Sequence, residues 1–197
     1  MNKPFLFIDF YRTVSFDHLW STHPRSKEIG ASTFCEGNRE RIAAWMRGEC
    51  TAEVMVADIA KNVDLSESEL WESLVQSATN LVVLEETIPL IKEAKKDYRV
   101  VLFTDNFDTF TRFTVPGNPS FYTVFDGIIN SADTGILKCD QLGKSFLNIA
   151  RDLITQSILV DDSDSSKETF EALGGKVFQV GTAELTMEAL RSVVTNH

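Results

Sequence analysis

Three short apolar segments of the chain each end in acidic or hydroxyl-bearing side chains. In a parallel sheet covered by helices, ligands bind beyond the carboxyl ends of the strands, so side chains at these positions are expected to converge. The polar residues that follow the three segments are Asp9, then Thr104, Asp105 and Asn106, then Asp161, Asp162 and Asp164. Several carboxylates in one crevice repel one another unless a cation neutralises them, and oxygen-only ligation suits Mg²⁺. The spacing therefore predicts a magnesium site.

Such a site suits phosphoryl transfer. A carboxylate beside Mg²⁺ can attack a phosphorus centre, because the metal screens its repulsion from the incoming anion. The transition state also calls for a small hydroxyl and a lysine on the non-bridging oxygens. Thr104 and Lys138 are placed to supply these groups, and Lys144, which begins a helical pattern, is the alternative lysine. We therefore expect a small phosphorylated molecule as the substrate.

The elements that must position these residues alternate between strand and helix. The apolar runs, rich in Val, Ile and Phe, are typical of strands in a parallel sheet covered on both faces, at residues 5–9, 99–105, 157–162 and 176–181. Helical spacing of apolar residues occurs at 86–97, 144–153 and 167–173. This alternation predicts an α/β fold with a doubly wound parallel sheet.

The segment from 16 to 85 interrupts that alternation. It contains no strong strand pattern, and its apolar residues have helical spacing at 40–48, 51–62 and 66–81. Ser66 and Glu69 have the spacing of a capping box at a helix start. We therefore expect a helical domain at 16–85, inserted into an α/β core domain formed by 1–15 and 86–197.

The composition excludes several classes of partner. The 197 residues include 19 basic and 29 acidic side chains, which gives a net charge of −10. A chain this acidic, with no basic cluster, is not expected to bind nucleic acid or a membrane surface. Three widely spaced cysteines and an apolar N-terminal run too short for a secretory signal lead us to expect a cytoplasmic protein. The oligomeric state is not encoded in any pattern that we can interpret.

Four motifs together resemble those of the haloacid dehalogenase-like hydrolase superfamily. They share the order and spacing of the superfamily motifs along nearly the whole chain, at 5–14 (FLFIDFYRTV), 101–106 (VLFTDN), 135–138 (GILK) and 158–163 (ILVDDS). The first is similar to a strand ending in D-x-D-x-T, and the last to a strand ending in an acidic pair. Residues 45–51 (WMRGECT) resemble the linker W-x-x-G-E-x-T/S of a helical cap inserted between the first two motifs.

The resemblance implies a role for each matching residue. Asp9 would be the nucleophile, and Mg²⁺ would be held by Asp9, the carbonyl oxygen of Tyr11, Asp162 and also Asp161. Thr104 and Lys138 would bind the phosphoryl oxygens. We expect Arg12, Asp105 and Asn106, which adjoin these residues, to contact the substrate as well. The cap would close over the substrate and exclude water.

Two positions depart from the superfamily pattern and leave alternatives open. Tyr11 replaces the second aspartate of the first motif, the usual general acid and base, and Arg12 replaces a small glycine. Tyrosine can donate a proton but is a weak base at neutral pH. His18 or His23 could supply the proton instead. An Asp-x-Tyr motif is also similar to that of metal-independent 2-haloacid dehalogenases, and loss of the acid would suit a weakly active or noncatalytic ligand-binding protein.

Overall fold

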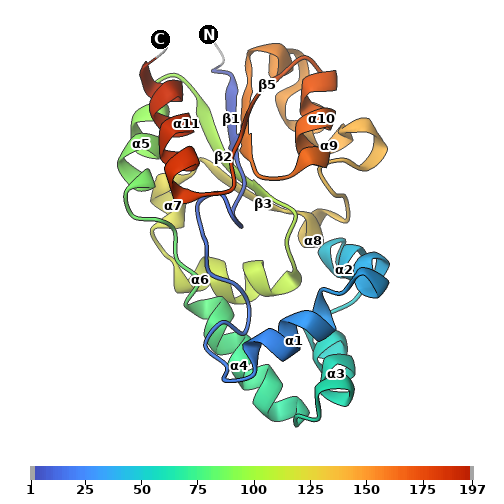
Figure 1. The fold of residues 1–197 in the computed structure, drawn as a ribbon. Helices are drawn as coiled ribbons and strands as arrows, with labels where there is room; N and C mark the ends of the chain where they lie inside the picture. Colours follow the sequence, from blue (N-terminus) through green and yellow to red (C-terminus); the bar gives the residue numbers. More distant parts are fainter. Residues whose placement is uncertain (1–2, 196–197) are drawn as a thin grey trace.

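The computed structural model describes residues 3–195 and contains a five-stranded parallel sheet (Figure 1). The strand order is β3-β2-β1-β4-β5, and β1 lies at the centre between β2 and β4. The strands are β1 (Phe5–Ile8), β2 (Arg99–Thr104), β3 (Gly127–Asn130), β4 (Ile158–Asp161) and β5 (Lys176–Gln179). The predicted doubly wound α/β fold is confirmed.

Helices cover both faces of the sheet. In Figure 1, α5 and α11 lie on one side of the strands, and α9 and α10 on the other. The longer helices of this part are α5 (Thr87–Ala94), α9 (Lys144–Ala150), α10 (Asp164–Ala172) and α11 (Ala183–Thr195). The short ones are η2 (Phe110–Thr114), α6 (Val115–Gly117), α7 (Phe121–Val124), α8 (Ser131–Thr134), η3 (Asp140–Leu142) and η4 (Arg151–Gln156).

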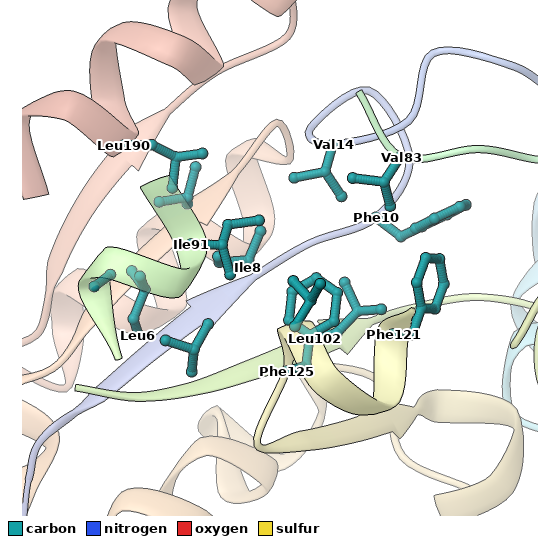
Figure 2. Packing of buried hydrophobic residues seen from close by; sticks show 14 of the residues in the cluster. Leu6, Ile8, Phe10, Val14, Val83, Ile91, Leu102, Phe121, Phe125 and Leu190 are labelled. Atoms are coloured by element: carbon teal, nitrogen blue, oxygen red, sulfur yellow. The ribbon is translucent and has the colours of Figure 1, made fainter. Parts of the chain in front are cut away.

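Alternation along β1 divides the core into two clusters, because successive side chains of a strand point to opposite faces. Leu6 and Ile8 pack toward α5 and α11, where they meet Ile91 and Leu190 (Figure 2). Phe5 and Phe7 belong to the second cluster, on the side of α9 and α10. The Phe7 ring lies 5.4 to 5.8 Å from the rings of three other buried phenylalanines, Phe103, Phe146 and Phe170. These packed faces fix the strand ends that carry the acidic residues.

The chain between β1 and β2 is helical, as predicted, and has a hydrophobic cluster of its own. It contains α1 (Ser26–Thr33), η1 (Glu36–Asn38), α2 (Arg39–Met46), α3 (Ala52–Val63) and α4 (Glu67–Thr79). Ser66 caps α4 by accepting a hydrogen bond from the backbone N–H of Glu69. Trp20 and Trp45 are fully buried in this cluster of the inserted helices, among residues of α3 and α4. Figure 1 shows α1, α3 and α4 grouped together below the sheet.

One strand escaped the sequence analysis. The edge strand β3 has only two strongly apolar residues, Ile128 and Ile129, between Gly127 and Asn130. Its pairing with β2, from Val101 with Gly127 to Thr104 with Asn130, provides the regularity that its composition lacks.

Within residues 3–195, no helix combines the length and the apolar composition that a bilayer-spanning segment requires.

Candidate active site

The acidic residues at the ends of β1 and β4 lie next to each other. Ile8 is paired with Val160, and the backbone N–H of Asp9 donates to the carbonyl oxygen of Val160 at 2.9 Å. Asp9 and Asp161 are buried, with exposed fractions of 5% and 1%. Oxygen atoms of Asp9, Asp161 and Asp162 all lie within 4.8 Å of one another. The predicted convergence of these carboxylates is therefore present.

Lys138 connects carboxylates at the ends of three different strands, β1, β2 and β4. Its Nζ lies 2.6 Å from Asp9 Oδ1 and 2.6 Å from Asp161 Oδ2, and its side chain is only 2% exposed. Its backbone N–H donates to the carboxylate of Asp105 at 3.0 Å. Lys144, by contrast, is exposed, and its Nζ donates to Gln141. Of the two lysines considered from the sequence, the fold brings Lys138 to Asp9.

The charges of this cluster do not balance. Asp9, Asp105, Asp161 and Asp162 contribute four negative charges when ionised, and Lys138 and Arg12 contribute two positive charges, which leaves two in excess. Buried like charges are costly unless a counter-charge compensates them. A divalent cation bound between Asp9, Asp161 and Asp162 supplies the missing two charges, and carboxylate oxygens are its preferred ligands. The residues present therefore fit Mg²⁺.

Burial changes the acidity of these groups. It raises the pKa of Asp9 from 3.8 to about 7; the positive charge of Lys138 opposes this rise, and the charge of Asp161 adds to it. Burial also raises the pKa of Asp105 and of Asp162. For Lys138, burial alone would lower the pKa, but the charges of Asp161, Asp9 and Asp105 outweigh it, and the pKa rises. Without a further cation, Asp9 is thus partly protonated near neutral pH.

The loop after β1 is tight and holds two residues that depart from the superfamily pattern. The backbone N–H groups of Thr13, Val14 and Ser15 all donate to the carbonyl oxygen of Phe10. Arg12 has a positive φ of 55°, in the left-handed region that glycine adopts more easily. Its Nη1 lies 3.5 Å from Asp162 Oδ2, so a cation stands beside the carboxylates.

Three buried hydroxyl groups, two in this loop and one at the end of β2, have no hydrogen-bond partner within residues 3–195. They are the hydroxyls of Thr13, Ser15 and Thr104. Buried polar groups are normally paired, so each is a place where a ligand oxygen or a water is expected. Thr104 lies two residues beyond Leu102, the partner of Ile8, and thus at the same edge of the sheet as Asp9.

The other candidate residues lie around a cavity of about 440 Å³ beside this cluster. Tyr11, Asp105 and Asn106 contribute to its wall, and so does His18 from the segment that follows β1. Tyr11 is 45% exposed. His23 is not part of this wall; its Nε2 lies 3.5 Å from a carboxylate oxygen of Glu69. Of the two histidines, only His18 shares a cavity with Tyr11.

The sequence analysis missed the contacts that hold the inserted helices against the sheet domain. Arg47, at the end of α2, donates two hydrogen bonds to Asp140, at 2.7 and 2.8 Å. Asp140 Oδ2 also accepts the backbone N–H of Leu137, next to Lys138. Gly48 has a φ of 68°, and a Cβ there would lie 2.2 Å from the carbonyl oxygen of Ala132. The pairing of Arg47 with Asp140 has no signature in the sequence, since 93 positions separate them.

Comparison with known proteins gives structural matches only. No protein-family model and no curated protein sequence matches this chain. A predicted haloacid dehalogenase-like family hydrolase from Porphyromonas gingivalis has a similar structure, with a TM-score of 0.70, 16% identity and full coverage of both chains. A variant of a haloacid dehalogenase family enzyme from Bacteroides thetaiotaomicron, in complex with magnesium and inorganic phosphate, has a TM-score of 0.71 and 14% identity, covering 90% of this chain and 94% of that one.

The structure of a dehalogenase is also similar to that of this chain. L-2-haloacid dehalogenase from Xanthobacter autotrophicus, with chloropropionic acid covalently bound, has a TM-score of 0.64 and 15% identity, and the match covers 100% of this chain and 84% of that one. The three matches cover 90 to 100% of this chain, so they include its five-stranded parallel sheet and the helices between β1 and β2. The chain therefore has the fold of the haloacid dehalogenase-like hydrolases, with a helical insertion between β1 and β2.

Proposed function

We propose that this protein is a Mg²⁺-dependent phosphatase that hydrolyses a small phosphomonoester through a phosphorylated Asp9. The observation that carries this proposal is the cluster in which oxygen atoms of Asp9, Asp161 and Asp162 lie within 4.8 Å of one another. Together with Asp105, these ionised carboxylates carry two negative charges beyond the positive charges of Lys138 and Arg12. Such a cluster suits a divalent cation and, with it, a phosphate dianion. The site thus favours phosphorus over carbon as the atom attacked.

The chain's own residues have distinct roles in this proposal. A carboxylate oxygen of Asp9 forms a bond to phosphorus, and the bond from phosphorus to the ester oxygen breaks. Tyr11 donates its phenolic proton to the leaving oxygen, which departs as the alcohol. A water molecule then attacks the aspartyl-phosphate, inorganic phosphate is released with Asp9 restored, and the proton lost by the water returns to Tyr11. The net reaction is the ester plus water giving the alcohol plus phosphate.

The remaining residues hold the phosphoryl group. Mg²⁺ bound by Asp9, Asp161, Asp162 and the carbonyl oxygen of Tyr11 would screen the charge between nucleophile and substrate. Lys138 Nζ, 2.6 Å from Asp9, and the buried hydroxyl of Thr104 would donate to phosphoryl oxygens. Asn106 lines the cavity beside the cluster, and Arg12 lies 3.5 Å from Asp162; both would contact the substrate. Asp105, whose carboxylate accepts the backbone N–H of Lys138, would act chiefly by positioning that lysine.

We also propose a division of the chain into two domains. Residues 16–85 would form the cap that encloses the substrate, on a core formed by 1–15 and 86–197. The separate hydrophobic cluster around Trp20 and Trp45 supports this division. The three cysteines are free, which agrees with a cytoplasmic protein in a reducing environment.

Two other functions follow from specific observations. The sequence Asp9-Phe10-Tyr11 and the structural match to L-2-haloacid dehalogenase favour displacement of a halide from carbon. The excess negative charge argues against it, because a haloacid carboxylate would be repelled in the absence of a metal. Loss of the usual acid at position 11 favours a ligand-binding protein with little or no turnover.

One set of assays separates these functions. Release of p-nitrophenol from p-nitrophenyl phosphate is measured with Mg²⁺ and with EDTA, for the natural chain, for Asp9→Asn and for Asp152→Asn, which changes an exposed carboxylate outside the site. The phosphatase proposal predicts Mg²⁺-dependent release that Asp9→Asn abolishes and Asp152→Asn leaves intact. Chloride release from 2-chloropropionate in EDTA would support the dehalogenase. No release from either compound would support the binding protein.

A further inference from the structure

The cavity beside the acidic cluster has mainly apolar walls. Its volume is about 440 Å³, within the range of pockets that enclose most of a small organic ligand. Ile42 and Met46 of α2 and Phe34, just after α1, face it from the inserted helices, and Leu81 and Phe107 contribute from nearer the sheet. A sugar or another polyol would place hydroxyl groups against this apolar surface, where they find no hydrogen-bond partner.

Aromatic rings line up along one side of the cavity. Phe107 is stacked on Trp45, with ring centroids 3.9 Å apart and an interplanar angle of 20°, and it is stacked more distantly on Phe34, at 6.3 Å and 28°. The buried Trp45 is itself fixed by a hydrogen bond of 2.7 Å from its Nε1 to Asp108. Phe34 remains 49% exposed and Tyr11 45% exposed. A flat apolar group placed between them would cover aromatic surface that now faces water.

The charges of the cavity wall oppose a second anionic group. In the described part of the chain, this wall contains Asp17 and Asp105 and has no lysine or arginine. Recognition of a second phosphate or a carboxylate calls for a cation that can pair with it. The cations of the neighbouring cluster, Lys138 and Arg12, lie beside Asp9, Asp161 and Asp162, where the proposed mechanism uses them for the transferred phosphoryl group, so they do not serve a second anion. A nucleotide or a sugar bisphosphate therefore does not match this wall.

The cavity adjoins the proposed reaction centre directly. Phe10 and Tyr11, which form part of the wall, immediately follow Asp9 in the chain. Asp105, also in the wall, accepts the backbone N–H of Lys138, whose Nζ contacts Asp9. A phosphoryl group held at Asp9 and Lys138 thus leaves its ester substituent beside the apolar walls.

From this arrangement we propose that the cavity binds the alcohol portion of the substrate and selects phosphomonoesters of uncharged aromatic or other apolar alcohols over those of sugars and nucleosides. This inference rests on the proposed phosphatase function and specifies its substrate class. Phe34, Ile42, Met46 and Phe107 are the residues that determine the preference.

Binding tests this preference independently of turnover. Methylphosphonate and benzylphosphonate carry the same non-hydrolysable anionic group, and only the second has an aromatic ring. Titration calorimetry with Mg²⁺ present is expected to show benzylphosphonate binding at least about tenfold more tightly, since each buried methylene alone contributes a factor of roughly four. The ligand is also expected to change the fluorescence of Trp45 through its stacked neighbour Phe107. Equal affinities for the two phosphonates would overturn the inference.

Turnover separates failure of this inference from failure of the proposed function. Acetyl phosphate, 2-naphthyl phosphate, glycerol 2-phosphate and glucose 6-phosphate are compared by kcat/KM. The inference predicts 2-naphthyl phosphate above both polyol esters by at least about tenfold. Hydrolysis of acetyl phosphate with no preference for the naphthyl ester would overturn the substrate class and leave the phosphatase standing. No hydrolysis of any of the four would overturn the phosphatase.

Matched variants locate the preference in the cavity. Phe34→Ala removes a half-exposed ring from the wall, and Tyr122→Ala removes a 67% exposed ring that is not among the residues of the wall. Phe34→Ala is expected to lower the ratio of 2-naphthyl to glycerol phosphate turnover several-fold, and Tyr122→Ala to leave it unchanged. Ile42→Asp, which places a charge in the wall, is expected to lower the same ratio further. A ratio that is unaffected by both wall variants would contradict the assignment.

Discussion

Replacing Asp9 by Asn should make the metal-free protein more stable at alkaline pH. The carboxyl group of Asp9 is 5% exposed, and burial raises its pKa from 3.8 to about 7. The folded protein therefore retains this proton over a pH range in which the unfolded chain has lost it. Stability falls as pH rises wherever the folded state binds more protons, so this group destabilises the fold progressively from about pH 4 to about pH 7.

The magnitude follows from the same two pKa values. The difference between 3.8 and about 7 corresponds to roughly 4 kcal/mol at full ionisation. Since Asp9 is already partly ionised in the unfolded chain at pH 5, the part lost between pH 5 and pH 8 is about 2 to 3 kcal/mol. Asn keeps an oxygen that can accept from Lys138 and carries no charge. Asp9→Asn should thus exceed the natural chain in stability by about 2 to 4 kcal/mol at pH 8.

Urea unfolding in EDTA, followed by tryptophan fluorescence at several pH values between 5 and 8, measures this difference. Trp20 and Trp45 are fully buried and report the transition. Asp152→Asn removes the same charge at an exposed position and should follow the natural chain. Asp105 and Asp162, whose pKa values are also raised by burial, should leave a residual slope in Asp9→Asn. Parallel pH profiles for the natural chain and Asp9→Asn, or a less stable Asp9→Asn at pH 8, would refute the reasoning.

Two further changes test the same cluster, and a third tests the contact between Arg47 and Asp140. Lys138→Met should lower the free energy of unfolding at pH 7 by about 3 to 5 kcal/mol, measured with urea, because it leaves Asp9 and Asp161 buried without their shared cation. Arg12→Gly removes a cation 3.5 Å from Asp162, so calorimetry should show the Kd for Mg²⁺ falling about two- to fivefold; a weaker affinity would contradict the assignment of Asp162 as a ligand. Asp140→Asn should cost about 1 kcal/mol at pH 7 and progressively less as the pH falls below 3.8, the ordinary pKa of the group, because the hydrogen bond from Arg47 lowers the pKa of Asp140 in the folded protein. A cost that does not change with pH would argue for a packing effect instead.

The fold was largely predictable because its strongest strands are buried on both faces. Such strands read as continuous apolar runs, and the carboxylates that follow them mark the strand ends without any knowledge of strand order. The convergence of Asp9 with Asp161 follows from this rule alone. Strand β3 was not predictable in the same way, because its four residues rely on pairing with β2 for their conformation.

The contacts across the chain were not predictable. Helical spacing indicates which residues of α2 face inward, and it does not indicate what lies opposite them. The angle at which the inserted helices meet the sheet domain determines these contacts. It brings Trp45 onto Phe107 and Arg47 to Asp140. The apolar cavity is a product of that angle, so its chemistry became visible only in three dimensions.

The two departures from the superfamily motif act on the electrostatics of the site in the same direction. An aspartate at position 11 would add one negative charge, and a glycine at position 12 would remove one positive charge, so Tyr11 and Arg12 together reduce the negative excess by two. Two excess charges remain, which still matches one divalent cation, but the attraction for it is weaker than four would provide. Arg12 adopts a left-handed conformation that costs about 1 kcal/mol relative to glycine, and its guanidinium stands beside Asp162. In the proposed mechanism, the substitutions lower the demand for metal and add a cation that can face a phosphate, and the proposed proton donor is a phenol instead of a carboxylic acid. A phosphatase built this way is expected to bind its substrate's phosphate with less help from Mg²⁺ and to depend more on the acidity of the leaving alcohol, as aryl esters provide.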